Sequence, residues 1–290
     1  MAGFHRLHYV EWGASDNPRV VVCAHGYSGN ARDFDFLASA LEPEARVVCP
    51  DVAGRGESDR LATAFQYHFP QFLSDINSLV ARLGVEQVDW VGTSMGGLLG
   101  MMLAAQPGNR IRRLVMNDVG AFLPMAALNH IALNLKAPSH FASLAEVEAH
   151  MRHTHRDWGE LTQTQWRHLA IHGARRVDGK YRPHFDPQIA TPFQSFAMGP
   201  GLFFWDKWAQ VRCPVLLIRG ERSDVFPRAV ADVMLAMKRD ARLVEIPGCG
   251  HAPALMSPSQ LGIVRDFLVG AVTARQRRFS HVRYDATSSM

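Results

Sequence analysis

The sequence predicts an α/β protein with a largely parallel sheet, because short apolar strands alternate along it with helical segments. The continuous apolar run at 20–24 is rich in β-branched residues and has the length of a buried strand, and the segment 111–117 is another expected strand. The segment 71–83 has the apolar periodicity of an amphipathic helix. With 290 residues, the chain is long enough for one large α/β domain that carries an insertion.

Strands and helices alternate in a regular order over most of the chain. The N-terminal part holds strands at 6–12 and 20–24, a glycine-containing loop at 25–30 and a helix at 33–41. Pro50 ends the next strand, since proline cannot donate to a sheet hydrogen bond. The other expected elements are strands at 45–49, 85–91, 111–117, 214–219 and 242–246, and helices at 71–83, 98–106 and 260–272.

The alternation stops between about Gly120 and Ala209. This stretch has helical patterns, several prolines and many aromatic residues but no clear buried strand, and it is too long for a simple connection. We therefore expect residues 1–120 and 210–278 to form the core and 121–209 to form a helical cap. The tail at 279–290 is polar and unpatterned, and we expect it to be mobile.

Composition excludes several classes of function. The formal net charge is only +4 and no basic stripe with interleaved aromatics occurs, so nucleic acid is not an expected partner. We expect no membrane span or signal peptide, because the chain lacks a long apolar run and an apolar N-terminal segment. The 4 cysteines are scattered without C-x-x-C spacing, which favours a reduced, cytoplasmic protein. The oligomeric state is left open.

The strand at 85–91 runs into Gly92-Thr93-Ser94-Met95-Gly96, and a helical segment follows. A strand, the pattern Gly-x-Ser-x-Gly and a helix are typical of a nucleophile elbow. Small residues two positions from the serine let the strand and the helix approach closely. The serine hydroxyl would then be exposed at a helix N-terminus, where backbone N–H groups stabilise negative charge. Ser94 is therefore the candidate nucleophile.

A serine nucleophile needs a base and an orienting acid. His251 is the candidate base, because it lies in a glycine- and proline-rich loop after the last expected strand. Asp224, just past the strand at 214–219, is the favoured acid, since its carboxylate could accept a bond from Nδ1–H of His251. Asp118, at the end of the strand at 111–117, is the alternative acid. Its other role would be to anchor the start of the cap.

The oxyanion of the reaction needs two hydrogen-bond donors. Met95 follows the nucleophile and would supply one backbone N–H group. Tyr27 follows His25-Gly26 at the end of the strand at 20–24, where the loop is expected to pass the elbow. Tyr27 and Met95 are therefore the predicted oxyanion hole.

Together these segments resemble the α/β-hydrolase superfamily, in its single-domain, esterase-like group with a helical cap. The resemblance rests on His25-Gly26-Tyr27, on 51–58 (Asp-Val-Ala-Gly-Arg-Gly-Glu-Ser), on the elbow, on 220–224 and on Gly250-His251. It implies an eight-stranded, mostly parallel sheet, a triad of Ser94, Asp224 and His251, and a pocket between sheet edge and cap. It implies no cofactor.

A metal site is not expected. His150, His153 and His155 invite that interpretation, but their spacing cannot place all three on one helical face. We expect them on the solvated surface of the cap instead.

The expected activity is serine-dependent hydrolysis of a small to medium, fairly apolar carboxylic ester, thioester or lactone through an acyl-enzyme on Ser94. The partner is thus a small-molecule substrate. Hydrolysis of a carbon–carbon bond in ring-cleavage diketones, with the same triad, is an alternative. A further alternative is a receptor-type binding protein with very slow turnover.

Overall fold

The computed structural model describes residues 3–135, 138, 140–192, 200–270 and 282–283. Eight strands form one sheet in the order β1-β3-β2-β4-β5-β10-β11-β12. β1 (Tyr9–Trp12) runs antiparallel to β3 (Arg46–Pro50), and the other neighbours are parallel. This arrangement confirms the predicted mostly parallel sheet. The other strands are β2 (Val20–Ala24), β4 (Val88–Thr93), β5 (Ile111–Asn117), β10 (Val215–Gly220), β11 (Arg242–Ile246) and the two-residue β12 (Val282–Arg283).

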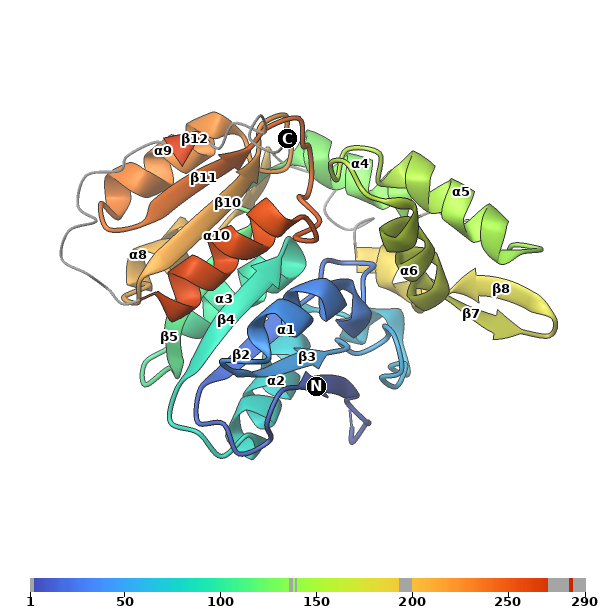
Figure 1. Cartoon of the computed structure of the whole chain (residues 1–290), viewed down its shortest axis with the longest axis horizontal. Helices are drawn as coiled ribbons and strands as arrows, with labels where there is room; N and C mark the ends of the chain where they lie inside the picture. The colour runs from blue at the N-terminus through green and yellow to red at the C-terminus, as the bar shows by residue number, and fades with distance from the viewer. Residues whose placement is uncertain (1–2, 136–137, 139, 193–199, 271–281, 284–290) are drawn as a thin grey trace.

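Helices cover both faces of the sheet, because alternate residues of its strands point to opposite sides. In β2, Val20 and Val22 belong to one apolar cluster, whereas Val21 and Cys23 belong to the other. The second cluster packs under α1 (Asp35–Leu41) and α10 (Pro258–Val269), which lie in front of the sheet in Figure 1. The first cluster contacts α2 (Phe69–Arg82), α3 (Met95–Ala104), α8 (Trp205–Gln210) and α9 (Arg228–Met237).

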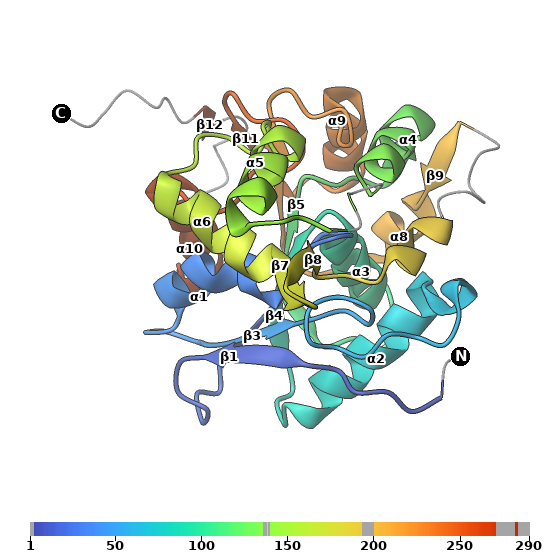
Figure 2. The ribbon, with the colours of Figure 1, turned by 90° about the vertical axis from the view of Figure 1, so that its right-hand side faces the viewer.

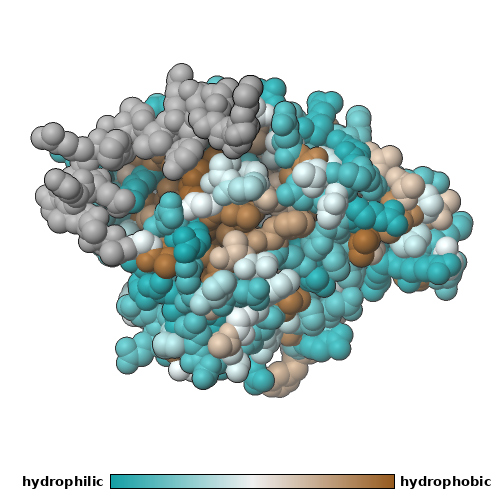
Figure 3. Space-filling view, viewed as in Figure 1, coloured by the Kyte–Doolittle hydropathy of each residue, from teal (hydrophilic) through white to brown (hydrophobic). Residues whose placement is uncertain are grey.

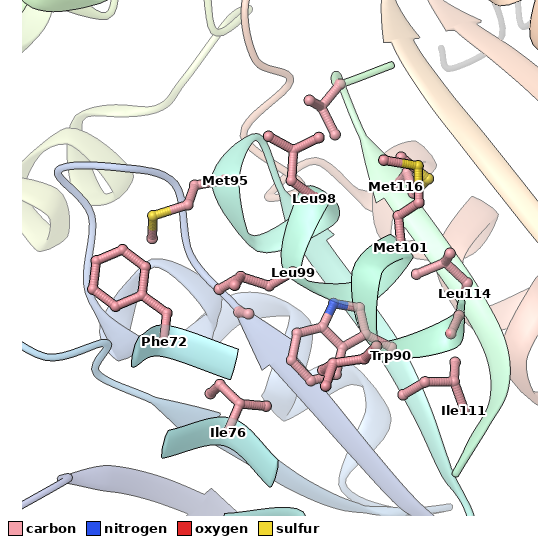
Figure 4. Close-up of a cluster of buried hydrophobic side chains, with 14 of the residues drawn as sticks. Phe72, Ile76, Trp90, Met95, Leu98, Leu99, Met101, Ile111, Leu114 and Met116 are labelled. Atoms are coloured by element: carbon pink, nitrogen blue, oxygen red, sulfur yellow. The ribbon is translucent and has the colours of Figure 1, made fainter. Parts of the chain in front are cut away.

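The first cluster is centred on α3. In Figure 4, Leu99 of α3 lies between Phe72 of α2 and Trp90 of β4. The indole N–H of Trp90 is buried and donates to the carbonyl of Gly96 (2.9 Å), so it satisfies a polar group that burial would otherwise leave costly. Strand β4 and the start of α3 are therefore held together by apolar packing and by one side-chain hydrogen bond.

The chain between β5 and β10 covers the stretch for which the sequence predicts a helical insertion, and it holds several helices. Its helices α4 (Met125–Asn134), α5 (Leu144–Thr154) and α6 (Gln163–Gly173) lie beyond the carboxyl ends of the sheet strands (Figure 1), and Figure 2 looks onto them. Two small antiparallel pairs of strands, which the sequence analysis did not expect, accompany these helices. They are β6 (Phe122–Pro124) with β9 (Gly201–Phe203), and β7 (Ala174–Val177) with β8 (Lys180–Pro183).

Several elements differ from the expected ones. Helix α9 was not predicted, although Pro227 precedes it and Val230 and Met234 bury its apolar face. Helix α3 begins directly after Ser94, three residues earlier than the periodicity suggested. Most of the tail at 279–290 lies outside the described residues, apart from the two residues of β12.

On the face that Figure 3 shows, most of the coloured residues are hydrophilic, and hydrophobic residues gather toward the middle. Among the helices of the described ranges, none combines the length and apolarity needed to cross a bilayer.

Two helical glycines give a matched test of this packing. A Cβ atom at Gly100 in α3 would collide with the ring of buried Trp90 and with Leu114, whereas one at Gly262 in α10 would meet nothing within 4 Å. We expect Gly100→Ala to lower the free energy of unfolding by about 1–3 kcal/mol through overpacking. Gly262→Ala should raise it by about 0.4–1 kcal/mol by reducing the entropy of the unfolded chain.

Urea denaturation of the two variants beside the parent protein measures both effects. Equal shifts of the same sign would contradict the packing described around α3.

Candidate active site

The predicted elbow is present at the junction of β4 and α3. Ser94 has φ 51° and ψ −115°, a left-handed backbone conformation that is uncommon for residues with a side chain. A Cβ atom at Gly96 would collide with the carbonyl of Ala24, and one at Gly92 would collide with Gly96. Only glycine therefore allows α3 to approach β2 and β4 this closely. Met95 is the first residue of α3, so its N–H is among those without an acceptor inside the helix.

Ser94 is hydrogen-bonded to a histidine that is in turn bonded to an acid. The Oγ of Ser94 lies 3.0 Å from Nε2 of His251, and Nδ1 of His251 lies 2.7 Å from Oδ2 of Asp118. The carboxylate can only accept, so Nδ1 carries the proton and Nε2 is left to accept from the serine hydroxyl. The structure thus brings together Ser94, His251 and Asp118.

Asp118 is fully buried and its carboxylate has three donors. Its Oδ1 accepts from the backbone N–H of Gly220 (2.7 Å), and its Oδ2 accepts from the hydroxyl of Ser223 (2.6 Å) as well as from His251. These donors offset the cost of burying a charge. They also fix the carboxylate between the end of β5, the loop after β10 and the histidine loop.

The expectation that Asp224 contacts His251 is wrong. The side chain of Asp224 is 54% exposed and its Oδ2 lies 3.1 Å from Nδ1 of His130 in α4. The physical reason is the course of the loop after β10. Ser223 turns inward and hydrogen-bonds to Asp118, so the next side chain points away from the sheet edge.

The loop after β2 passes the elbow as predicted. A Cβ atom at Gly26 would lie 3.8 Å from the Cβ of Ser94, and both Tyr27 and Ser94 line the same pocket. His25 anchors this loop from below. Its Nδ1–H donates to the carbonyl of Gly26 (2.6 Å), and its Nε2 accepts from the N–H of Val52 (3.0 Å).

Burial keeps His25 neutral. Desolvation lowers its pKa to about 4, although the hydrogen bond to Gly26 opposes this shift. The uncharged ring then has one donor and one acceptor, and both are used. His25 therefore ties the loop after β2 to the end of β3.

Arg55 lies beneath the same loop. Its guanidinium is fully buried and donates to the carbonyls of Tyr27 (2.9 Å) and Ala53 (2.8 Å). It also stands over the aromatic rings of Tyr27 (4.7 Å) and Phe72 (5.1 Å). Burial lowers the pKa of this guanidinium, but the cation–π contacts and the carbonyl acceptors stabilise its charge.

A cavity of about 170 Å³ opens beside Ser94. Most of its wall is apolar and comes from the segment 121–209, and the remainder comes mainly from the loop after β2, from Ser94 and from His251. Asp33 also lines it, and its carboxylate accepts from the N–H of Asn30 (3.2 Å). Desolvation raises the pKa of Asp33 to about 7, so this group carries much less than a full negative charge near neutrality. The apolar cap residues that line the cavity are Ile131, Leu135, Phe141, Val147, Met151, Trp158, Leu169, Pro183 and Phe185.

The sequence suggested that the three cap histidines all lie on the solvated surface. The structure does not place all of them there. His150 and His155 line the apolar cavity, whereas His153 is exposed. His155 packs edge-on against Trp158, with 4.1 Å between the ring centroids. Burial lowers the pKa of His155 to about 4, so its ring is neutral. His150 and His155 therefore belong to the wall of the cavity.

A different group has potential metal ligands. One atom each from Asp35, His168 and His172 lies within 4.8 Å of the others. Arg32 already occupies this group, because its Nε lies 2.7 and 2.9 Å from the two carboxylate oxygens of Asp35 and its carbonyl lies 2.9 Å from Nε2 of His168. The arginine thus provides the positive charge that a metal ion would supply there.

Sequence reasoning did not foresee that two buried residues, His25 and Arg55, hold the loop after β2. The burial of His25 and Arg55 depends on contacts between distant segments, and no local pattern indicates it. Asp118 also follows an expected strand, but the sequence does not show which of the two candidate acids turns toward His251.

Known proteins resemble this chain along almost its whole length. Residues 19–258 match the family model described as alpha/beta hydrolase fold. A 3-hydroxybutyrate-oligomer hydrolase from Cupriavidus necator is 43% identical over 93% of this chain and 95% of that protein.

Two solved structures agree with these matches. An alpha/beta hydrolase from Novosphingobium aromaticivorans has a TM-score of 0.82 and 32% identity, covering 91% of this chain and 94% of that one. A structure from Rickettsia typhi reaches a TM-score of 0.86 at 29% identity, covering 91% of both chains. The chain therefore belongs to the α/β-hydrolase family and is an enzyme of the hydrolase class.

Proposed function

We propose that this protein is a serine hydrolase that cleaves carboxylic esters through an acyl-enzyme on Ser94. The observation that carries the proposal is the hydrogen-bonded chain from Ser94 Oγ to His251 Nε2 (3.0 Å) and from His251 Nδ1 to Asp118 (2.7 Å). A serine alcohol is a weak nucleophile, and a neutral imidazole within hydrogen-bond reach is the base that activates it.

In the first half of the reaction, Nε2 of His251 takes the proton of Ser94 as Oγ attacks the ester carbonyl. The resulting imidazolium is stabilised by the carboxylate of Asp118, and then gives its proton to the leaving alcohol oxygen as the C–O bond breaks. In the second half, a water molecule loses a proton to His251 and attacks the acyl-enzyme. The acid product leaves and Ser94 regains its proton.

The developing oxyanion is held by the backbone N–H groups of Met95 and Tyr27 in this proposal. Met95 begins α3, so the helix dipole adds to its hydrogen bond. The buried cation of Arg55 donates to the carbonyl of Tyr27 and adds positive potential behind the loop. Such preorganised donors are the largest single contribution to catalysis in many enzymes.

The substrate we propose is a short linear ester of 3-hydroxybutyrate units. The support is the 43% identity to the Cupriavidus necator 3-hydroxybutyrate-oligomer hydrolase over nearly the full length of both chains. The mainly apolar cavity above Ser94 suits the methyl-bearing acyl part of such an ester. The ring of His155 in the cavity wall is neutral, so it places no fixed charge next to an uncharged acyl chain.

Removal of the nucleophile is the first test. Ser94→Ala should lower kcat by about 10³- to 10⁶-fold, because the acyl-enzyme cannot form. Multiple-turnover hydrolysis of p-nitrophenyl butyrate measures this loss. A Ser94→Ala protein with most of the parent turnover would exclude the mechanism.

The acid is tested by a matched pair of variants. Asp118→Asn should lower kcat by about 10⁴-fold, since an amide facing Nδ1 of His251 favours the wrong tautomer. Asp224→Asn should change kcat for the same neutral ester by no more than about threefold, because its carboxylate is exposed and bonded to His130. The reverse pattern in the same p-nitrophenyl butyrate assay would assign the acid to Asp224.

The substrate class is tested with a panel of compounds. The linear dimer and trimer of 3-hydroxybutyrate should be turned over repeatedly, with kcat/KM about tenfold or more above that of a lactone, a thioester or a ring-cleavage diketone. Preference for the diketone would instead favour carbon–carbon hydrolysis. Labelling of Ser94 by a fluorophosphonate without turnover of any compound would favour a binding protein.

A further inference from the structure

A second cavity reaches the catalytic histidine from the other side. It has a volume of about 370 Å³ and shares His251, Ile131 and Thr154 with the apolar cavity. Its wall is formed by α4, by the end of α5 and by the loops that follow β10 and β11. We refer to it as the leaving-group cavity. Its lining includes more charged side chains than that of the apolar cavity, and its charged and ionisable residues besides His251 are His130, His153, Arg156, Asp157, Arg222 and Asp224.

The acids of this cavity already have partners. Asp224 is bonded to His130 (3.1 Å), and Asp157 lies 3.6 Å from Arg156. Arg222 differs, because its guanidinium donates to the neutral backbone carbonyl of Gly248. Among the described residues, no ion pair with a carboxylate involves Arg222. The cavity therefore holds one arginine whose charge no acid neutralises directly.

Arg222 is also held in place beside the histidine loop. Its backbone N–H donates to the carbonyl of Cys249 (2.8 Å), two residues before His251. Its side chain bonds to Gly248 in the same loop. The guanidinium keeps further N–H donors, since arginine has five and can bind a carboxylate with two of them.

The chemistry of the proposed substrate places its carboxylate on this side. His251 must protonate the leaving oxygen, so the leaving group lies next to His251 while the acyl group occupies the apolar cavity. In a 3-hydroxybutyrate oligomer, one methylene group separates the carbon that bears the leaving oxygen from the next carboxyl carbon. In the dimer, that carboxyl is a free carboxylate. It therefore falls within the cavity that adjoins His251.

We propose that the leaving-group cavity binds the terminal carboxylate of the substrate through Arg222. This inference rests on the proposed function, because it assigns one end of the ester that the function names. It makes the enzyme selective for esters whose alcohol part is itself a hydroxy acid. Neutral esters would still react, without this contribution to binding.

The test compares the linear 3-hydroxybutyrate dimer as the free acid with its uncharged methyl ester. Arg222→Gln should lower kcat/KM for the acid by about tenfold to a hundredfold, chiefly through KM, because a hydrogen bond to a charged group is lost. The value for the methyl ester should stay unchanged. Arg222→Lys should retain part of the preference for the acid.

Arg212→Gln is the matched control, since Arg212 is also exposed and also donates to a backbone carbonyl, that of Ala209 (3.1 Å), away from the cavity. Equal losses on acid and methyl ester in Arg222→Gln would reduce Arg222 to a support of the histidine loop and overturn the proposal. Unchanged kinetics on both substrates would overturn it too.

A second measurement uses the parent protein alone, so it does not depend on the folding of a variant. The 3-hydroxybutyrate anion should inhibit hydrolysis of p-nitrophenyl butyrate competitively, about tenfold more strongly than methyl 3-hydroxybutyrate does. Equal inhibition would contradict carboxylate binding. The proposed function itself would fail if the parent protein hydrolysed none of the three esters, namely the dimer, its methyl ester and p-nitrophenyl butyrate. That outcome is distinct from the failure of carboxylate binding.

Discussion

The close approach of α3 to β2 fixes the geometry of the whole site. Gly96 lies so near the carbonyl of Ala24 that no side chain fits between them. The same approach turns Ser94 into a left-handed conformation, with its N–H bonded to the carbonyl of Asn117 (2.9 Å) in β5. Backbone strain of this kind persists only where surrounding contacts hold it. Here Trp90 supplies such a contact, because its indole binds the first turn of α3.

Asp118 extends this order to the rest of the sheet edge. It joins β5 to the loop after β10 through Gly220 and Ser223, and it orients His251 through Nδ1. Asn117 adds a parallel link, since its Nδ2 donates to the carbonyl of Pro253 (2.8 Å) in the histidine loop. A buried carboxylate with three donors is well satisfied, and removing one donor affects the others. The position and orientation of the Asp118 carboxylate are thus set by the same hydrogen bonds.

The buried strands could be predicted from the sequence, and the directions of loop side chains could not. Val20–Ala24, Ile111–Asn117 and Arg242–Ile246 form strands with the expected bounds, because short segments with several apolar residues between turn residues leave few alternatives. Helix α9 was missed although its signal was present, namely Pro227 followed by apolar residues at helical spacing.

The two candidate acids show where sequence reasoning ends. Asp118 and Asp224 follow strands that are neighbours in the sheet, so both lie near the same edge. The choice depends on which side chain the loop turns inward, and Ser223 takes the inward place after β10. That outcome arises from hydrogen bonds between segments more than a hundred residues apart in the chain.

The segment 121–209 is tied to the core at the loop after β2, which carries Tyr27. The hydroxyl of Tyr27 donates to the carbonyl of Ile189 (2.9 Å), and the hydroxyl of Tyr67 donates to Asp186 (2.7 Å). The N–H of Asp186 in turn donates to the carbonyl of Gly54 (2.7 Å), which precedes Arg55 in the chain. A displacement of the cap would therefore act on the buried guanidinium and on Tyr27 together. In the proposed function the cap selects substrate shape and the loop after β2 stabilises charge, so these two roles are coupled through one short segment of chain.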